Sequence, residues 1–223
     1  MSYPQVFNEW ETVRMLQQGF SISRFGDGEF KMIDGAGYVR EPPNKKLAKE
    51  LRGVLRKPPK NLLRAIPTMD PRGAKFATWR KHINRFERIL GGTKGPFYSA
   101  FISRPDSAQW IRTREFAEEF VKVWRGRPVR VAVLCEKDSK TRTLIRSTMP
   151  DGSWYHFACP SHKAYARIDE FESGITEVRP DIAILSCGMT ATCLAARLAR
   201  RGIQAIDFGS GGKYLLELLN ANE

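Results

Sequence analysis

Short apolar runs alternate with amphipathic segments along most of this 223-residue chain. Apolar runs predict strands at residues 20–25, 62–66, 97–102, 129–134, 154–158, 181–186 and 204–208. Helical spacing predicts helices at residues 6–18, 44–57, 71–90, 106–124, 139–147, 162–174 and 190–201, with a last one from residue 213. Strands that alternate with helices are typical of a mostly parallel sheet covered on both faces. The pattern therefore predicts an α/β fold.

The organisation along the chain is predicted to be simple. No repeat, low-complexity tract or long linker interrupts residues 1–223, so we expect a single domain. The predicted helix at 71–90 begins at Pro71 and carries an apolar face, and Gly91 and Gly92 follow it. Residues 40–94 are interpreted as a basic helical insertion beside the sheet.

The composition is that of an ordinary globular protein, with 42% hydrophobic and 27% charged residues. The first residues do not resemble a signal peptide, and no apolar run approaches membrane-spanning length. None of the four cysteines falls in a C-x-x-C pair, so we interpret them as small core residues. A cytoplasmic protein, of a bacterium or of a phage-infected cell, is expected.

The positive charge is concentrated in one region. The whole chain has a formal net charge of +13. Residues 40–94 hold sixteen Lys or Arg and four Asp or Glu, a net of 16 − 4 = +12, and the remainder holds 21 − 20 = +1. A single basic block favours an anionic partner.

The stretch 21–30 is the most informative, because a short strand runs into a glycine-flanked acidic turn and a helix then begins. Asp27 and Glu29 lie where a parallel strand ends, and open α/β sheets bind ligands there. Carboxylates suit Mg²⁺ or Mn²⁺, which take further oxygens from phosphates and water. The alternative is a structural helix start with Asp27 as its N-cap. The residues predicted to contact the bound ligand here are Arg24, Gly26 and Gly28.

Two further strand ends carry ligand-type residues. Ser186, Gly188 and Thr190 follow an apolar strand and open a helix, where free backbone N–H groups suit phosphate. Close packing of the helix on the sheet is the equally weighted alternative. Asp207 and Gly209 begin a glycine-rich loop that could approach a ligand closely, although it could equally be a tight strand-to-helix turn. Asp207 could act as a base or contact a ribose.

Two weaker signals complete the set of strand ends. Ser103 and Arg104 follow a strand, and an arginine there could bind an anionic group, although a surface ion pair is the alternative. His162 could act as a base, although packing or capping is the commoner role. Since the carboxyl ends of parallel strands meet at one edge, the five groups can converge. The combination suits a metal-bound nucleotide diphosphate.

With these motifs the chain resembles the GT-D-fold glycosyltransferases, a bacterial family whose early signature is S-x-x-R-F-G-D-G-E, containing a metal-associated D-x-E motif. Residues 21–29 are similar to that signature. The pair Ser103-Arg104 is similar to a family Ser-Arg pair that follows a central strand. Residues 160–165 and 187–209 are similar to two later family segments, P-x-x-x-A-[FY] and G-P-T-A-T followed by a helix.

The resemblance implies a Rossmann-like fold, a UDP-sugar donor, and Mn²⁺ or Mg²⁺ bound by the D-x-E carboxylates. The chain departs from the family at Met189, where the family has proline, and at Ser210, where it has histidine. Any role of that histidine in donor or metal binding is therefore not carried over.

The sequence is interpreted as a metal-dependent glycosyltransferase that uses a nucleotide-diphospho-sugar. Arg24 and Arg104 would neutralise the leaving group, and Glu29, Asp207 or His162 would be the base of an inverting reaction. Inversion and retention both stay open. Clustered Lys and Arg attract phosphate backbones, so the predicted acceptor is a hydroxymethylated base in double-stranded DNA, as in phage DNA modification. The residues predicted to contact it are Lys75, Arg80, Lys81, Arg85 and Arg88.

Two alternatives to that interpretation stay open. A glycan or glycoprotein acceptor is what the family resemblance by itself implies. A non-catalytic nucleic-acid-binding domain with a Rossmann-like shell would explain the charge but would leave the Gly-Asp-Gly-Glu turn without a purpose.

Overall fold

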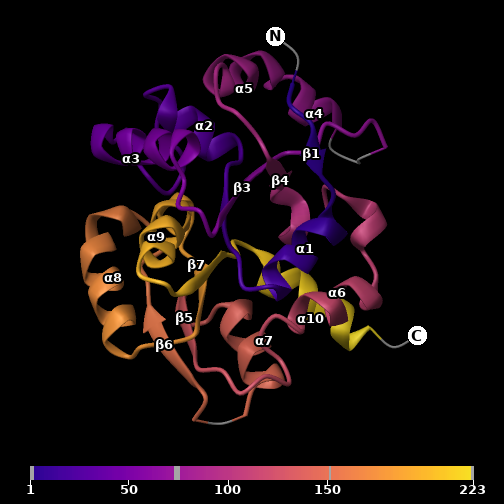
Figure 1. The fold of residues 1–223 in the computed structure, drawn as a ribbon, viewed down its shortest axis with the longest axis vertical. Helices are drawn as coiled ribbons and strands as arrows, with labels where there is room; N and C mark the ends of the chain where they lie inside the picture. Colours follow the sequence, from indigo (N-terminus) through magenta and orange to yellow (C-terminus); the bar gives the residue numbers. More distant parts are fainter. Residues whose placement is uncertain (1–2, 73–75, 151, 222–223) are drawn as a thin grey trace.

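The protein is described here by a computed structural model that places residues 3–72, 76–150 and 152–221. A single sheet runs through these residues in the order β1-β4-β3-β2-β8-β7-β5-β6, and every pairing in it is parallel (Figure 1). The strands are β1 (Val6–Phe7), β2 (Ser21–Arg24), β3 (Leu62–Ile66), β4 (Phe97–Ser99), β5 (Val131–Cys135), β6 (Trp154–Ala158), β7 (Ile182–Ser186) and β8 (Gln204–Asp207). The predicted α/β fold with a parallel sheet is confirmed.

Helices cover both faces of the sheet. One core cluster packs beneath α2 (Asp27–Ile33), α3 (Lys45–Arg56), α5 (Ile83–Leu90), α8 (Ile168–Glu177) and α9 (Met189–Arg200). The other packs beneath α1 (Glu9–Gln17), α6 (Arg114–Val121), α7 (Lys140–Thr148) and α10 (Gly211–Asn220). The short elements are α4 (Phe76–Arg80) and the 3₁₀ turns η1 (Ala100–Ser103), η2 (Gln109–Ile111) and η3 (Ala164–Arg167).

The inner strands are apolar because both of their faces are covered. All residues of β5 are buried, and β5 pairs with β7 in register from Val131 opposite Ile182 to Cys135 opposite Ser186. Such strands form near-continuous hydrophobic runs rather than alternating patterns. Since every pairing is parallel, the carboxyl ends of the strands share one edge.

The pairing of β2 with β8 is the weakest ladder of the inner sheet. Among the described residues it has one register pair, Ile22 opposite Ile206. Side chains supply further bonds across this seam: the Ala205 N–H donates to Ser21 Oγ over 2.9 Å, and the Gln204 side-chain amide donates to backbone oxygens of Leu16 and Phe20. The seam therefore depends on side-chain hydrogen bonds as well as on the backbone.

Several predicted boundaries are wrong. The helix predicted at 6–18 begins only at Glu9, because Asn8 caps it in a reciprocal bond pair with Glu11, and Val6–Phe7 instead pair with β4 as β1. The helix predicted at 106–124 is reduced to η2 and α6, since Thr113 caps α6.

The single helix predicted at 71–90 is also wrong over its described part, which holds two helices, α4 and α5, separated at Lys81 and His82. A turn in which the His82 N–H donates to the Trp79 carbonyl separates them. The strand predicted at 97–102 ends at Ser99, whose hydroxyl caps η1.

Residues 40–94 contribute β3 to the sheet, between β2 and β4, in addition to helices α3 to α5. Arg64, one of the basic residues of this segment, lies within β3 and is buried. Its guanidinium donates to the carbonyls of Leu55 and Lys94 and lies 4.8 Å from the Phe97 ring centroid. In the part of the chain that is described, no helix is long and apolar enough to cross a membrane.

Substitutions at two glycines are expected to change the stability of the protein in opposite directions. A Cβ on Gly212 would lie 2.3 Å from the Thr141 Cα, because α10 packs closely on α7, whereas a Cβ on Gly53 in α3 would meet nothing within 4 Å. We expect Gly212→Ala to lower the free energy of unfolding by about 1–3 kcal/mol. Gly53→Ala should raise it by about 0.5–1 kcal/mol, since alanine favours a helix interior. Urea denaturation measures both, and equal effects would contradict the packing.

Candidate active site

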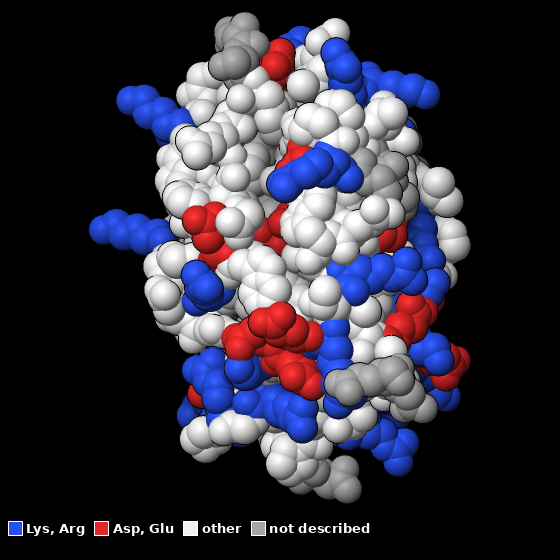
Figure 2. All heavy atoms as spheres, turned by 90° about the vertical axis from the view of Figure 1, so that its right-hand side faces the viewer, with Lys and Arg blue, Asp and Glu red and all other residues white. Residues whose placement is uncertain are grey.

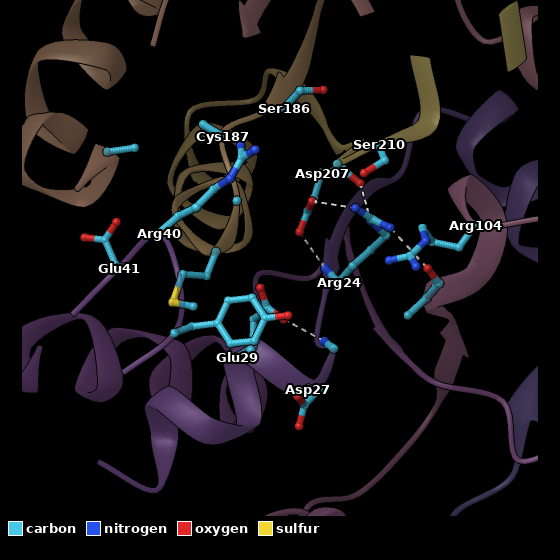
Figure 3. Close-up of a pocket in the computed structure, with 18 of the residues that line it drawn as sticks. Arg24, Asp27, Glu29, Arg40, Glu41, Arg104, Ser186, Cys187, Asp207 and Ser210 are labelled. Atoms are coloured by element: carbon cyan, nitrogen blue, oxygen red, sulfur yellow. Dashed lines mark hydrogen bonds and ion pairs between the residues drawn. The ribbon is translucent and has the colours of Figure 1, made fainter. Parts of the chain in front are cut away.

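A pocket of about 450 Å³ opens at the carboxyl edge of the sheet (Figure 3). Each of the five strand ends singled out in the sequence contributes residues to its wall, and so does the loop after β5. One residue from each of these strand ends illustrates this: the wall includes Arg24, Arg104, Ser161, Gly188 and Asp207. The parallel sheet thus brings together groups that lie far apart in the sequence.

Arg24 lies at the centre of the bonded network on the floor of the pocket (Figure 3). Its Nε donates to the Asp207 carbonyl over 2.6 Å, and Nη1 donates to Ser103 Oγ over 2.5 Å and to the Ala100 carbonyl over 3.2 Å. Its Nη2 pairs with Asp207 Oδ1 at 3.2 Å. These contacts occupy four of its five N–H groups. Arg24 therefore ties β2, β8 and η1 together.

Asp207 is the partner on which this network depends, with a side chain that is 4% exposed. Its Oδ2 accepts from the Arg24 backbone N–H and from the Thr192 hydroxyl, both over 3.0 Å. Burial raises the pKa of the Asp207 carboxyl, and the charge of Arg24 and these hydrogen bonds oppose that rise. The carboxylate is therefore held in place by bonds that also align β2 with α9.

Glu29 lines the pocket from the first turn of α2. Its Oε2 accepts from the Gly26 N–H over 2.7 Å, so it closes the first turn in the manner of a capping box. Burial, and next the charge of Asp207, raise the pKa of Glu29 to about 7. A structural role in starting the helix and a position facing a ligand thus coincide in this one side chain.

Asp27 has a different environment. Figure 3 shows its carboxylate pointing away from that of Glu29. Its Oδ2 pairs with Lys31 Nζ at 2.6 Å, and its Oδ1 lies 3.5 Å from Arg85 Nη1 and 3.8 Å from His82 Nε2. Oδ1 is buried and has no hydrogen-bond partner. Helix α5, from the basic segment 40–94, therefore reaches the acidic turn.

Two glycines that follow β7 and β8, Gly188 and Gly209, form another part of the pocket wall. Gly188, the N-cap of α9, has φ +62°, and Gly209 has φ +53°. A Cβ on Gly209 would lie 2.1 Å from Arg24 Nη2, so the Arg24 side chain occupies the space that any other residue would need. Ser186 lines the same wall, and its hydroxyl bonds to Thr141 Oγ1 over 3.0 Å.

Other predicted site residues fall in different places. Arg104 lines the pocket and is paired with Asp106 through Nε and Nη2. His162 is exposed, bonded to the neighbouring Ser161, and does not line the described pocket wall. Thr190 is fully buried, its Oγ1 has no hydrogen-bond partner, and it too is absent from the described wall.

The predicted nucleic-acid contacts are divided among several surroundings. Arg80 and Lys81 are exposed. Arg85 and Arg88 both pair with Asp34, at 3.2 and 2.7 Å, and Arg85 also approaches Asp27. Lys75 lies outside the described residues.

Sequence reasoning missed several pocket residues. Glu136 directly follows β5, so the strand-end argument could have found it. Tyr38 and Arg40 come from the loop between α2 and α3, and Trp79 comes from α4; none of them follows a strand. Only the tertiary fold places those three beside the carboxylates.

The chain matches the family named Glycosyltransferase GT-D fold over residues 22–213. The chain belongs to this family of glycosyltransferases. Membership agrees with the resemblance seen in residues 21–29 and in the later motifs.

Two curated relatives are streptococcal. Glycosyltransferase GlyD of Streptococcus pneumoniae serotype 4 is 25% identical over 209 residues, which is 87% of this chain and 25% of the relative. The probable glycosyl transferase Gly of Streptococcus gordonii is 24% identical over 208 residues, 87% of this chain and 30% of the relative. This chain thus spans between a quarter and a third of the length of these relatives.

Solved structures that are similar to this chain share its fold. One, described as the highly conserved domain of unknown function 1792 with a distinct glycosyltransferase fold, has a TM-score of 0.82 and 24% identity, covering 98% of this chain and 84% of that one. Another, a glycosyltransferase of the same domain type from Streptococcus sanguinis, has a TM-score of 0.80 and 20% identity, with 96% and 84% covered. The Rossmann-like arrangement of the GT-D type is therefore confirmed.

The contribution of the Arg24–Asp207 pair to stability can be tested by removing the charge of Asp207. Asp207→Asn keeps the shape of the side chain but leaves Arg24 buried without its counter-charge, so we expect the free energy of unfolding to fall by about 3–5 kcal/mol. The control is Glu118→Gln, which breaks the half-exposed Arg114–Glu118 pair and should change stability by about 0.5 kcal/mol or less. Similar losses in both variants, measured by urea denaturation, would contradict the role given to Asp207.

Proposed function

We propose that this chain is a metal-dependent glycosyltransferase that moves a sugar from a nucleotide-diphospho-sugar, a UDP-sugar by family resemblance, to an acceptor hydroxyl. The observation that carries the proposal is the meeting of Glu29, Asp207 and the N-terminus of α9 in one pocket at the carboxyl edge of the parallel sheet. Ligands of open α/β sheets bind at this edge. The family membership supplies the reaction class.

The residues of the pocket divide into donor-binding and positioning groups. The turn at Gly188 lines the pocket and precedes α9, and the N–H groups at the start of a helix suit the phosphates of the donor. Arg104 adds a positive charge at the wall, partly offset by Asp106. Arg24 is assigned a positioning role, since it holds the Asp207 loop with most of its donors occupied.

The acidic turn would fit a cation that takes few protein ligands if the Asp27 carboxylate, which pairs with Lys31 and points away from Glu29, turned toward the pocket. Glu29 faces the pocket, and Asp27 keeps a buried oxygen, Oδ1, without a hydrogen-bond partner. Among the described residues, no group of three or more His, Cys, Asp and Glu side chains is arranged to hold a metal by itself. Mg²⁺ commonly takes one or two carboxylates together with substrate phosphates and water. Asp27 and Glu29 would hold the ion, which would offset the charge of the diphosphate leaving group.

In the transfer step one bond forms, one bond breaks and one proton is transferred. The acceptor hydroxyl oxygen forms a bond to the anomeric carbon, and the bond from that carbon to the diphosphate oxygen breaks, so the nucleotide diphosphate leaves with the electron pair. The hydroxyl proton passes to a base. Of the three candidate bases, Glu29 and Asp207 line the pocket and His162 does not. An inverting and a retaining course are both compatible with this wall.

The acceptor is proposed from the charge of the chain and not from the residues of the pocket. A hydroxymethylated base in double-stranded DNA was predicted from the charge of residues 40–94, and Arg80 and Lys81 remain exposed as that hypothesis needs. However, Arg64 of the same segment is buried, and Arg85 and Arg88 pair with Asp34. On the face over α1, α4, α6 and α10, basic and acidic groups are interspersed (Figure 2). A glycan or glycoprotein acceptor remains the alternative.

Turnover of the sugar donor tests the proposed glycosyltransferase activity. With Mn²⁺ and a panel of UDP-sugars, we expect slow release of UDP by the wild type and a loss of about 100-fold or more in Glu29→Gln and Asp27→Asn. Chelation of the metal should have a similar effect. The matched control is Asp34→Asn, which removes an acid that also pairs with Arg85 but lies outside the described pocket wall.

Each result separates the enzyme from a non-catalytic binding domain. Normal turnover in Asp34→Asn with lost turnover in the other two variants supports the assignment of the acidic turn. Absence of both UDP binding and UDP release in the wild type would refute the glycosyltransferase proposal for this chain.

The DNA hypothesis predicts a salt effect. If a duplex binds through the exposed Arg80 and Lys81, its affinity should fall steeply with salt, and Arg80→Glu with Lys81→Glu should weaken it. Arg85→Gln should instead disturb the surroundings of Asp27, because Arg85 lies 3.5 Å from that carboxylate. Fluorescence anisotropy with a labelled duplex measures the affinity, and binding that is absent or insensitive to salt removes the hypothesis.

A further inference from the structure

A second cavity, of about 460 Å³, opens beside the donor pocket. We call it the annex; it is lined by residues 136–141, Ser186, Ser210 and Lys213, with Arg40 and Ser161 among its other wall residues. Its volume lies in the range of about 300–1,000 Å³ that is typical of small-molecule sites. The annex residues that do not line the donor pocket, Lys137 to Thr141 and Lys213, lie on the α7 and α10 side of the sheet, whereas the acidic turn belongs to the α2 and α9 side.

The annex has an excess of positive charge. Lys137, Lys140 and Lys213 are exposed side chains that line it from two different helix regions. Its acidic members are Asp138 and Glu136, and Glu136 is paired with Arg40 at 2.7 Å. Apart from the Arg40–Glu136 pair, the charged residues of the annex wall are therefore the three lysines and Asp138. Such a concave cationic surface concentrates anions.

The helices behind the annex add to this charge. A Cβ on Gly212 would lie 2.4 Å from the Thr141 backbone nitrogen, so the first turns of α10 and α7 are in direct contact. Neither first turn contains an acidic residue. Lys140 and Lys213 therefore stand at positive helix ends, an arrangement that is unfavourable unless an anion is bound.

The annex and the donor pocket share part of one wall. Seven residues line both cavities, and they are Arg40, Glu136, Cys159, Ser161, Ser186, Gly209 and Ser210. A molecule held in the annex can therefore extend into the pocket where the sugar would be transferred. The proposed site of the donor diphosphate is the acidic turn and the α9 N-terminus, away from the annex lysines.

We infer that the annex binds a phosphate group of the acceptor, so that the acceptor is a small phosphomonoester-bearing molecule in place of a base in duplex DNA. This inference rests on the proposed glycosyltransferase function. The chemistry is shared by a soluble sugar phosphate and by a phosphorylated lipid headgroup. A concave cavity of this size suits either one better than the convex surface of a duplex.

The test measures phosphate binding by calorimetry while UDP and Mn²⁺ are saturating, so that the donor site is already filled. We expect the wild type to bind inorganic phosphate, and Lys140→Gln with Lys213→Gln to weaken that binding roughly 10-fold or more. UDP affinity should be unchanged in this variant. The matched control is Lys49→Gln with Lys60→Gln, which removes two exposed lysines from outside the annex and should bind phosphate as the wild type does.

The outcomes are distinct. Equal phosphate affinity in the annex variant and the wild type overturns the inference. A parallel fall in UDP affinity also overturns it, because the annex would then hold the donor. If the wild type binds no UDP, the proposed function fails, and phosphate titration without UDP still decides whether the annex is an anion site.

Competition identifies the source of the phosphate. Displacement of phosphate by glucose 6-phosphate supports a soluble acceptor, and displacement by vesicles containing phosphatidic acid supports a lipid headgroup. Displacement by neither, or by a short DNA duplex alone in a manner that needs Lys140 and Lys213, overturns the inference.

Discussion

The buried ion pair between Arg24 and Asp207 is the interaction on which the rest of the structure depends. It crosses the seam between β2 and β8, where the recorded ladder is a single pair of isoleucines. Removing two charges from water is unfavourable unless hydrogen bonds satisfy them. Here Ser103, Thr192 and backbone carbonyls do so, and Gly209 leaves room for the guanidinium. The seam and the floor of the pocket are therefore the same set of bonds.

This overlap explains why the stretch 21–29 is so specific. Its apolar residues form a buried strand, its arginine joins the two halves of the sheet, and its last carboxylate both closes the first turn of α2 and faces the pocket. A helix-start interpretation and a ligand-binding interpretation are thus compatible for Glu29. Asp27 differs, since α5 surrounds it with Arg85 and His82.

The distribution of charge takes on a different meaning in three dimensions. The +12 of residues 40–94 is one block along the chain, but its members separate into a buried arginine, arginines paired with acids, and exposed side chains on different helices. By contrast, the lysines of the annex come from two places in the sequence, Lys137 with Lys140 and Lys213, and meet in one cavity. Packing between distant segments therefore decides which basic residues share a surface.

The sequence by itself determined the fold class and the edge at which the site lies. Buried apolar strands have a strong pattern because both faces of a parallel sheet exclude water, and ligand residues follow strand ends for topological reasons. Local caps such as Asn8 and Thr113, and the turn at His82, overrode the apolar spacing that suggested longer helices.

Only the tertiary structure decided the contacts of the site. Tyr38, Arg40 and Trp79 reach the pocket from loops and helices with no motif of their own, and Arg85 reaches Asp27 from 58 positions along the chain. Charge pairing and burial depend on packing between distant segments, and residue order does not encode that packing locally. The carboxylates could be found from the sequence, but their partners could not.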